Sequence, residues 1–419
     1  MRLTENDLNN IVKNVINEIE NIAYDRSKAN GENMKQIWKM IDEKQRKLQD
    51  MVFGSLNDKL FDITQEKIKS MGEEYAEVPN VICRAGNEKL PSSVLIVNMS
   101  SSLMCPSYYL GLCTITNGAC YAQRAENQYS GDNSVLTQRW KTDIMHTQML
   151  QQYQNGNKQS MKEYFSIIEM YIQLGNAYAT NLYKKEVKKL EFKLRRKLTK
   201  EEQNLLWIQQ SDYRITDVRL NETGDFHCQL AVDLWTKFAN KIKKKYNINT
   251  HAYTARNLDF SKASDVMTIN PSHKGINMGN NNTRMFKAVS NQFYDKLEGG
   301  DQVDENRQPI LGVYNDKFFY KCPCKKGVTT CDYCGVCFAP NKTGKDYTIF
   351  VKYHGMVAAN GLKHLFKKNE VENVIDKLYQ NGWVTDEEYS VYKSKPNQNK
   401  LNDLSKKIQG QRTKQKKTK

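Results

Sequence analysis

The sequence predicts an α/β fold with a mainly parallel sheet, and three consecutive segments near its middle support this prediction. Apolar and polar side chains alternate over 214–220, as they do in a half-buried strand. Apolar residues then recur at helical spacing over 229–244, and another strand is expected over 248–254. A strand, a helix and a strand at these intervals indicate parallel pairing through a crossover helix. An incomplete barrel is one arrangement that this pattern allows.

Further segments extend the predicted core on both sides. Residues 94–97 form a short apolar run that fits a buried strand. Residues 136–180 are expected to be helical, and more strands are expected over 266–269 and 347–353. We therefore place an α/β core domain at 78–360.

Segments of a different character flank or interrupt this core. Apolar residues at helical spacing predict a helical N-terminal extension over 1–77, and C-terminal helices are expected over 361–403. The basic end, 404–419, has only Leu404 and Ile408 as apolar side chains and is predicted to be disordered. Within the core, 184–203 is predicted to be a basic helical insertion, which is either a nucleic-acid-binding helix or an ordinary solvated one.

The composition restricts the class of protein. The 419 residues carry a net charge of +16, which favours contact with polyanions, nucleic acid first. The alternative is that lysine serves solubility alone. No apolar run reaches the length of a membrane-spanning helix, so no membrane partner is expected. The first residues do not form a secretory signal, so we expect an intracellular protein whose ten cysteines remain reduced.

A cluster of cysteines near the C-terminus predicts a metal site. Five cysteines fall within sixteen residues, and two-residue spacings let neighbouring thiolates converge on one ion. They are Cys322, Cys324, Cys331, Cys334 and Cys337. Both zinc and an iron–sulfur cluster are held by such thiolates, and the spacing does not separate them. His354 is a further candidate ligand, and a set of free structural cysteines is the alternative.

A second set of cysteines follows the strand predicted at 94–97. Cys105, Cys113 and Cys120 are separated by seven and then six residues, in a region rich in glycine, proline and asparagine. Three ligands would leave an open position on a metal, as catalytic sites do. Two alternatives remain: Cys105 is not a ligand, or one of these thiols belongs to the C-terminal set.

The turn after the strand at 214–220 is a third candidate. It lies where a parallel strand ends, which is where α/β proteins place ligand-binding groups. Gly224 allows close approach of a ligand, Asp225 can act as a base, and His227 can transfer a proton. Asp225 also suits a helix cap. Arg256 closes the next strand and is a candidate binder of carboxylate or phosphate, or an ordinary surface arginine.

Four short motifs in a fixed order resemble one family. They are Gly-Ala-Cys-Tyr-Ala at 118–122, Thr-Gly-Asp-Phe at 223–226, Tyr-Thr-Ala-Arg at 253–256 and Thr-Cys-Asp-Tyr-Cys-Gly-Val-Cys-Phe at 330–338. This order resembles the bacteriophage "gene product 88" domain family over about residues 90–355. The resemblance implies a phage or prophage origin and a metal-associated α/β domain, with no established activity to carry over. The first two motifs are also distantly similar to radical S-adenosylmethionine barrels, although the cysteine spacing differs.

These observations give three hypotheses about function. The first is a phage-encoded metalloenzyme with Cys105, Cys113 and Cys120 near Asp225, His227 and Arg256. Under this first hypothesis, the C-terminal cysteines hold a metal that is structural or that transfers electrons. The second is a non-catalytic, zinc-stabilised protein that binds nucleic acid through its basic helix and tail. The third is a virion or cargo protein that docks on other phage proteins through its N-terminal helix. The host cytoplasm is the expected location, with the virion as the alternative.

Overall fold

The computed structural model describes the middle of the chain. The described residues are 32–53, 82–87, 90–98, 105–110, 112, 135–211, 214–272, 276–279, 284–323, 331–352, 375–376, 378–380 and 382–394. Three of the predicted cysteine ligands, Cys113, Cys120 and Cys324, lie outside these residues, as does His354. The predicted tail at 404–419 and most of the predicted N-terminal extension also lie outside them.

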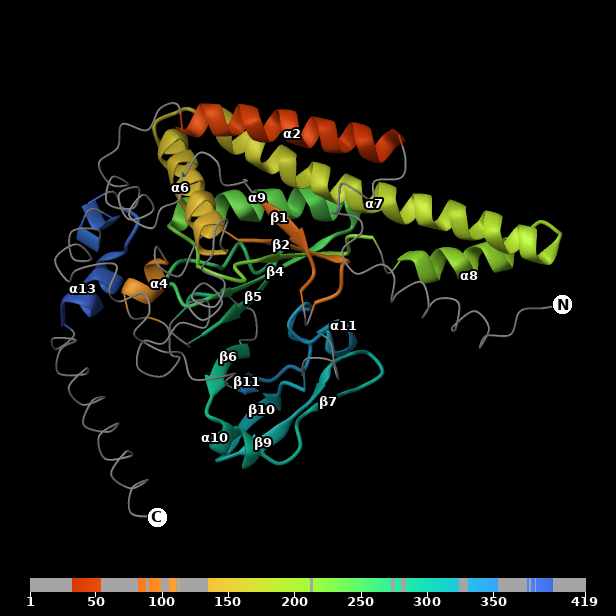
Figure 1. Cartoon of the computed structure of the whole chain (residues 1–419). Helices are drawn as coiled ribbons and strands as arrows, with labels where there is room; N and C mark the ends of the chain where they lie inside the picture. Colours follow the sequence, from red (N-terminus) through yellow and green to blue (C-terminus); the bar gives the residue numbers. More distant parts are fainter. Residues whose placement is uncertain are drawn as a thin grey trace, which may run out of the picture.

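A five-stranded sheet forms the centre of the fold (Figure 1). In spatial order its strands are β1 (Cys83–Ala85), β2 (Val94–Val97), β3 (Asp217–Leu220), β4 (Asn249–Thr254) and β5 (Thr268–Pro271). β1 is antiparallel to β2, and every other neighbouring pair is parallel. The predicted mainly parallel sheet is therefore confirmed. Among the described strands β1 and β5 are edges, so the pairing gives no support for an incomplete barrel.

The crossover between β3 and β4 is the helix that the sequence predicts. Helix α9 (Gln229–Tyr246) buries one apolar face, made of Ala231, Val232, Leu234, Trp235, Phe238, Ala239 and Ile242. It ends at Asn247, which has a φ of +55°, and three lysines occupy its last turn. Cations there interact favourably with the helix dipole. Amphipathic periodicity and end signals thus agree with the observed helix.

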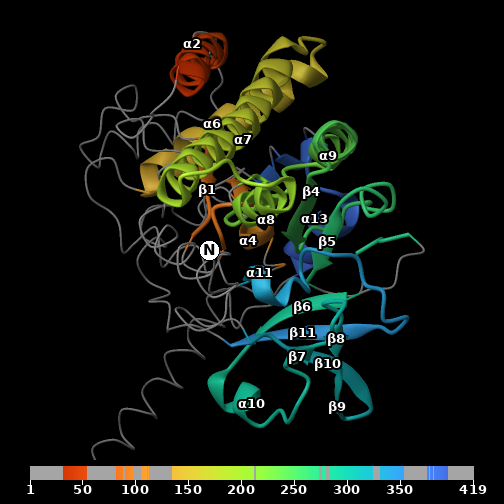
Figure 2. The ribbon, with the colours of Figure 1, turned by 90° about the vertical axis from the view of Figure 1, so that its right-hand side faces the viewer.

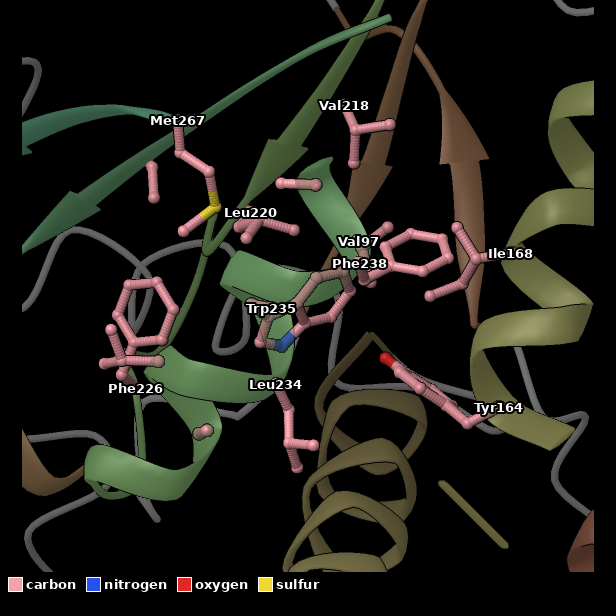
Figure 3. Packing of buried hydrophobic residues seen from close by; sticks show 14 of the residues in the cluster. Val97, Tyr164, Ile168, Val218, Leu220, Phe226, Leu234, Trp235, Phe238 and Met267 are labelled. Atoms are coloured by element: carbon pink, nitrogen blue, oxygen red, sulfur yellow. The ribbon is translucent and has the colours of Figure 1, made fainter. Parts of the chain in front are cut away.

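The connection between β2 and β3 is a helical layer. It contains α4 (Pro106–Tyr109), α6 (Val135–Gln154), α7 (Gln159–Leu194) and α8 (Lys200–Ser211). Tyr164 and Ile168 of α7 join Trp235 of α9 in one apolar cluster that covers the sheet (Figure 3). Helix α2 (Glu32–Phe53) lies along α7 and buries Ile41 and Leu48 against the same cluster (Figure 1). The described part of the N-terminal region therefore covers the body of its own chain.

The basic segment predicted at 184–203 is not a separate helix. α7 continues through it to Leu194, Arg195 turns the chain with a φ of +51°, and α8 begins at Lys200. The end of α7 and α8 form a helical hairpin that projects beyond the rest of the described fold (Figure 1). We call residues 184–202 the hairpin tip.

A second sheet lies beneath the central one (Figure 2). Its strands, in order, are β6 (Arg284–Val289), β11 (Tyr347–Lys352), β10 (Lys317–Lys321) and β9 (Gly312–Tyr314). β11 is parallel to both of its neighbours, and β9 is antiparallel to β10. A small β7 (Gln302–Val303) and β8 (Pro309–Ile310) pair lies apart. The strand predicted at 347–353 thus exists, but it belongs to a second sheet within the predicted core.

Three short helices complete the described fold. They are α10 (Asn291–Asp295), α11 (Cys331–Cys334) and α13 (Asp386–Ser394). Glu388 of α13 is buried against the loop that follows β4, so this C-terminal helix is part of the central unit. A search of the described helices for a membrane-crossing segment finds none.

Candidate active site

The predicted turn lies where three parallel strands end. β2, β3 and β4 finish side by side, with Val97 paired with Leu220 and Leu220 paired with Ala252. The loop after β3 turns sharply at Asn221, with a φ of +56°, and again at Gly224, with a φ of +79°. This loop carries Asp225 and His227 at the carboxyl edge of the sheet, which is where open α/β sheets bind ligands.

Asp225 is a buried hydrogen-bond acceptor with several donors. Its carboxylate accepts from the Ser107 hydroxyl at 2.7 Å, the Thr254 hydroxyl at 2.7 Å and the Ala255 backbone N–H at 2.8 Å. Burial raises the pKa of Asp225, although these hydrogen bonds and the charge of Arg256 oppose the change. Asp225 therefore joins α4, the β3 loop and the end of β4. Its oxygens are occupied, which argues against its predicted role as a base.

His227 belongs to a buried chain of three ionisable side chains. Its Nε2 lies 2.7 Å from Oδ1 of Asp143, and its Nδ1 lies 3.3 Å from Nδ1 of His146. Asp143, His146 and His227 are at most 4% exposed. Asp143 and His146 both come from α6, so this helix and the β3 loop together build the chain, which we call the Asp–His–His chain.

Both histidines of this chain are neutral near pH 7. Burial lowers the pKa of His227 to about 3, and the charge of Arg256 adds to this effect. Burial, together with His227, lowers the pKa of His146 well below its usual value. The charge of Asp225 opposes the change at His227, but two adjacent imidazolium ions in an apolar interior would repel each other strongly.

One assignment of tautomers fits these contacts when Asp143 is ionised. An ionised Asp143 only accepts, so His227 carries its proton on Nε2 and leaves Nδ1 as an acceptor. His146 then donates from Nδ1 and keeps the lone pair of Nε2. A proton taken up at this Nε2 would be stabilised through His227 by Asp143. The arrangement is that of a general base supported by a carboxylate.

Two unpaired polar atoms lie near this chain. The Tyr164 ring makes edge-to-face contacts with two neighbouring rings. The distance between ring centroids is 5.7 Å to His146 and 6.2 Å to Trp235. Within the described structure, the Tyr164 hydroxyl and the Trp235 indole N–H are buried without a hydrogen-bond partner. Such atoms are uncommon in folded proteins, because a buried donor without a partner costs about 1–3 kcal/mol. They are candidate contacts for a small polar ligand.

Arg256 is wholly buried, and all of its donors are used. Its Nε and Nη2 donate to the two oxygens of Glu388 at 2.8 Å each, and Nη2 also donates to the Trp383 carbonyl at 2.7 Å. Nη1 donates to the carbonyls of Phe226 and His227 at 2.6 and 2.7 Å. The predicted anion-binding role needs correction, because no N–H of this guanidinium remains for a ligand. Arg256 instead links Glu388 of α13 to the backbone carbonyls of the loop that carries His227.

Glu222 holds the start of the same loop in place. Its carboxylate accepts from Asn87 at 2.6 Å, pairs with Arg84 and lies 4.0 Å from Arg139. Burial raises the pKa of Glu222, but the charges of Arg84, Arg219 and Arg139 outweigh this effect and lower it. The start of the loop is therefore held by ion pairs of Glu222, and its end by hydrogen bonds from Arg256 to backbone carbonyls.

The described cysteines of the C-terminal set gather around one apolar cluster. Cys322, Cys331 and Cys337 pack against a core that contains Cys334, whose sulfur lies 3.1 Å from the Tyr320 hydroxyl. Burial raises the pKa of Cys337 to about 12; Arg284 opposes the change, and Cys322 and Cys334 add to it. Among the described residues, no three His, Cys, Asp or Glu side chains are arranged to hold a metal.

Of the first predicted cysteine set, only Cys105 is described. It is buried just before α4, two residues from Ser107, which donates to Asp225. The predicted open site of Cys105, Cys113 and Cys120 therefore stays a prediction, since its other two members lie outside the described residues.

Sequence reasoning missed three residues of this region, and it also missed a buried histidine outside it. Asp143 and His146 sit three positions apart on α6, and Glu388 lies more than a hundred residues from Arg256. His251 of β4 is fully buried and stacks on Phe338 at 4.3 Å, and neither ring nitrogen has a partner in the described structure. The Asp-x-x-His spacing on one helix was the one readable signal.

Comparisons with protein-family models, with curated proteins and with solved structures find no match to this chain. The resemblance to the phage "gene product 88" domain family therefore stays a prediction from four sequence motifs.

Proposed function

We propose that this chain is an enzyme whose general base is His146, supported by His227 and Asp143. The observation that carries the proposal is the buried Asp–His–His chain at the carboxyl edge of a parallel sheet. Apolar side chains of similar size would fill this volume at less cost, because burying ionisable groups costs several kcal/mol. Perturbed pKa values cluster at functional sites, although burial and structural ion pairs also produce them.

The chemistry that suits this arrangement is proton abstraction from a small polar substrate. The Nε2 of His146 accepts the proton, and the positive charge that develops is balanced by Asp143 through His227. The Tyr164 hydroxyl and the Trp235 indole N–H are suited to donate hydrogen bonds to substrate oxygens. Arg256 and Asp225 hold the loop and act as positioning residues.

A metal centre at the C-terminal cysteines is part of the same proposal. Four described thiols face one apolar cluster, a donor set that suits zinc or an iron–sulfur cluster. The described thiols do not complete a site by themselves. Cys324, which lies outside the described residues, is the proposed additional ligand. A metal there would fix the second sheet, and its binding would lower the pKa of thiols that are otherwise protonated.

Phage origin, action in the host cytoplasm and transport in the virion remain parts of this proposal, and they rest on the motif resemblance. Docking through the N-terminal helix also stays a proposal.

Untargeted mass spectrometry of a small-molecule cell extract tests the enzymatic proposal. Incubation with the wild-type protein should deplete one or a few compounds, and Asp143→Asn and His146→Gln should each slow this depletion by at least about a hundredfold. His251→Gln is the matched control, because His251 is equally buried and lies outside the Asp–His–His chain. Equal depletion by wild type and His146→Gln, both folded, would refute the proposal.

Metal analysis tests the second part. Protein purified without oxygen should contain zinc, or iron with broad visible absorption, and Cys334→Ser should reduce that content. Thr236→Ser on α9, which lies outside the cysteine cluster, is expected to leave it unchanged. Metal-free protein with the wild-type unfolding temperature would rule out a structural metal.

A further inference from the structure

The hairpin tip has its own small core and stands away from the central unit. Leu190 and Leu198 of the tip are buried together with Leu206 of α8, and Val187, Leu194 and Tyr183, just before the tip, pack around them. This cluster is separate from the main one that covers the sheet. The tip is therefore a folded arm, held by its own side chains, and not a disordered charged loop.

The arm carries a large excess of positive charge. The hairpin tip contains nine Lys or Arg and four Glu, a net charge of +5 within nineteen residues. Three of the glutamates are engaged: Glu191 with Lys197, Glu202 with Arg196, and Glu186, which is buried, with Lys189. The internal ion pairs thus use only part of the available cations.

Six cations of the arm are exposed and have no partner in the described structure. They are Lys184, Lys185, Lys188, Lys193, Arg195 and Lys200. Like charges this close repel one another, and only solvent and salt screen them. A surface of this kind favours a polyanion, because each phosphate contact releases bound counterions.

Phe192 lies among these cations and is 88% exposed. It is the most exposed of the large hydrophobic side chains in the described residues. It stands one position before Lys193 and three before the turn at Arg195, so cations lie on the same end of the arm. Nothing in the described fold covers this ring, and a flat aromatic face between cations matches a nucleobase attached to phosphates.

We propose that the hairpin tip binds single-stranded nucleic acid, with Phe192 stacked on a base and the unpaired cations on the phosphates. An exposed base is needed for stacking, so a single strand is favoured over a duplex. The proposal is independent of the Asp–His–His chain, because it involves a different surface and no chemical step.

Fluorescence anisotropy of the full-length protein with a labelled oligothymidylate tests it. Wild-type protein should bind, and its affinity should fall steeply as salt rises from about 50 to 200 mM. Phe192→Ala should weaken binding about tenfold, in line with the loss of one stacked base. Lys185→Glu combined with Lys188→Glu should weaken it further and flatten the salt dependence.

Matched controls come from the second sheet. Val313 of β9 is 62% exposed and Lys317 of β10 is exposed, so Val313→Ala and Lys317→Glu should leave affinity within about twofold of wild type. Binding that is unaffected by Phe192→Ala, or equally tight binding to a duplex, would overturn the proposal. So would absence of binding, or Phe192-dependent binding to anionic lipid vesicles in place of the oligonucleotide.

Discussion

The Asp–His–His chain and the hairpin tip use ionisable side chains in opposite ways. In the central unit, charged groups are buried, and Arg256 and Asp225 each have a full set of hydrogen bonds. In the hairpin tip, most cations face solvent without partners. A buried charged group without a partner costs several kcal/mol of stability, whereas an exposed one costs little because water solvates it. The buried contacts therefore determine stability, whereas the exposed charges remain available for binding.

The largest expected effect on stability comes from the Arg256–Glu388 pair. Glu388→Gln leaves a wholly buried guanidinium without its counter-charge, so the free energy of unfolding should fall by about 3–5 kcal/mol. Urea denaturation followed by circular dichroism measures it. Glu387→Gln, one position away on the exposed side of α13, should cost less than about 1 kcal/mol. Equal losses of unfolding free energy in the two variants would show that the buried Arg256–Glu388 pair contributes no more than an exposed carboxylate.

The same carboxylate makes a prediction about pH. Burial raises the pKa of Glu388, but the hydrogen bonds and charge of Arg256 outweigh this and hold the pKa below its usual value. The unfolded chain therefore binds the proton more tightly, and stability from this pair is lost as pH falls below the unfolded pKa of about 4.3. Glu388→Gln should be less sensitive to acid in that range. An unchanged acid-unfolding slope would contradict this account.

The neutral histidines give a smaller effect at milder pH. The folded pKa of His227 is about 3, below the unfolded value of about 6.5, so stability should fall as pH drops through this window. His227→Gln should reduce the slope by about 1.4 kcal/mol per pH unit, the value for one proton. Thermal unfolding between about pH 6.5 and pH 4.5 measures it. Parallel curves for wild type and variant would mean that His227 is protonated in the fold.

Removing one donor to Asp225 should cost less again. Thr254→Val deletes a hydroxyl that donates at 2.7 Å, and the remaining donors still hold the carboxylate. We expect a loss of about 1–2 kcal/mol in the free energy of unfolding. Thr236→Val is the control, because that hydroxyl donates only to a carbonyl of its own helix. If Thr254→Val loses no more free energy of unfolding than Thr236→Val, Asp225 does not act as a positioning residue.

The smallest effects are expected in the hairpin tip. Lys188→Ala and Phe192→Ala should change the free energy of unfolding by less than about 0.5 kcal/mol, since both side chains are exposed. The same denaturation experiment measures them. A loss of several kcal/mol would show that the tip stabilises the central unit, and the contrast between the two regions would fail.

Local periodicity was sufficient to predict the central elements. The run at 94–97 is β2, and the segment predicted at 229–244 is α9 with nearly the same bounds. Each of these elements is encoded by its own apolar pattern. The second sheet was not predicted, because β9 and β10 are short and partly exposed, and β6 alternates weakly.

The site was predicted only where its residues are neighbours in the chain. The turn with Asp225 and His227 lies at the edge of the sheet, as expected. The partners of these residues come from other elements: Asp143 is 84 positions away, and Glu388 is 132 positions from Arg256. A motif identifies the residue but not its partner. Arg256 was therefore interpreted as a ligand-binding group, although α13 already satisfies its charge.

Nitrogen-15 NMR of the histidine side chains reports the protonation state and the tautomer of each ring in the Asp–His–His chain. We expect His146 and His227 to be neutral at pH 7, protonated on Nδ1 and Nε2 respectively, and neither to titrate between about pH 7 and pH 5. Asp143→Asn should shift both signals together, because the three side chains form one hydrogen-bonded chain. Two histidines that titrate independently near pH 6.5, with signals unaffected by Asp143→Asn, would contradict this expectation.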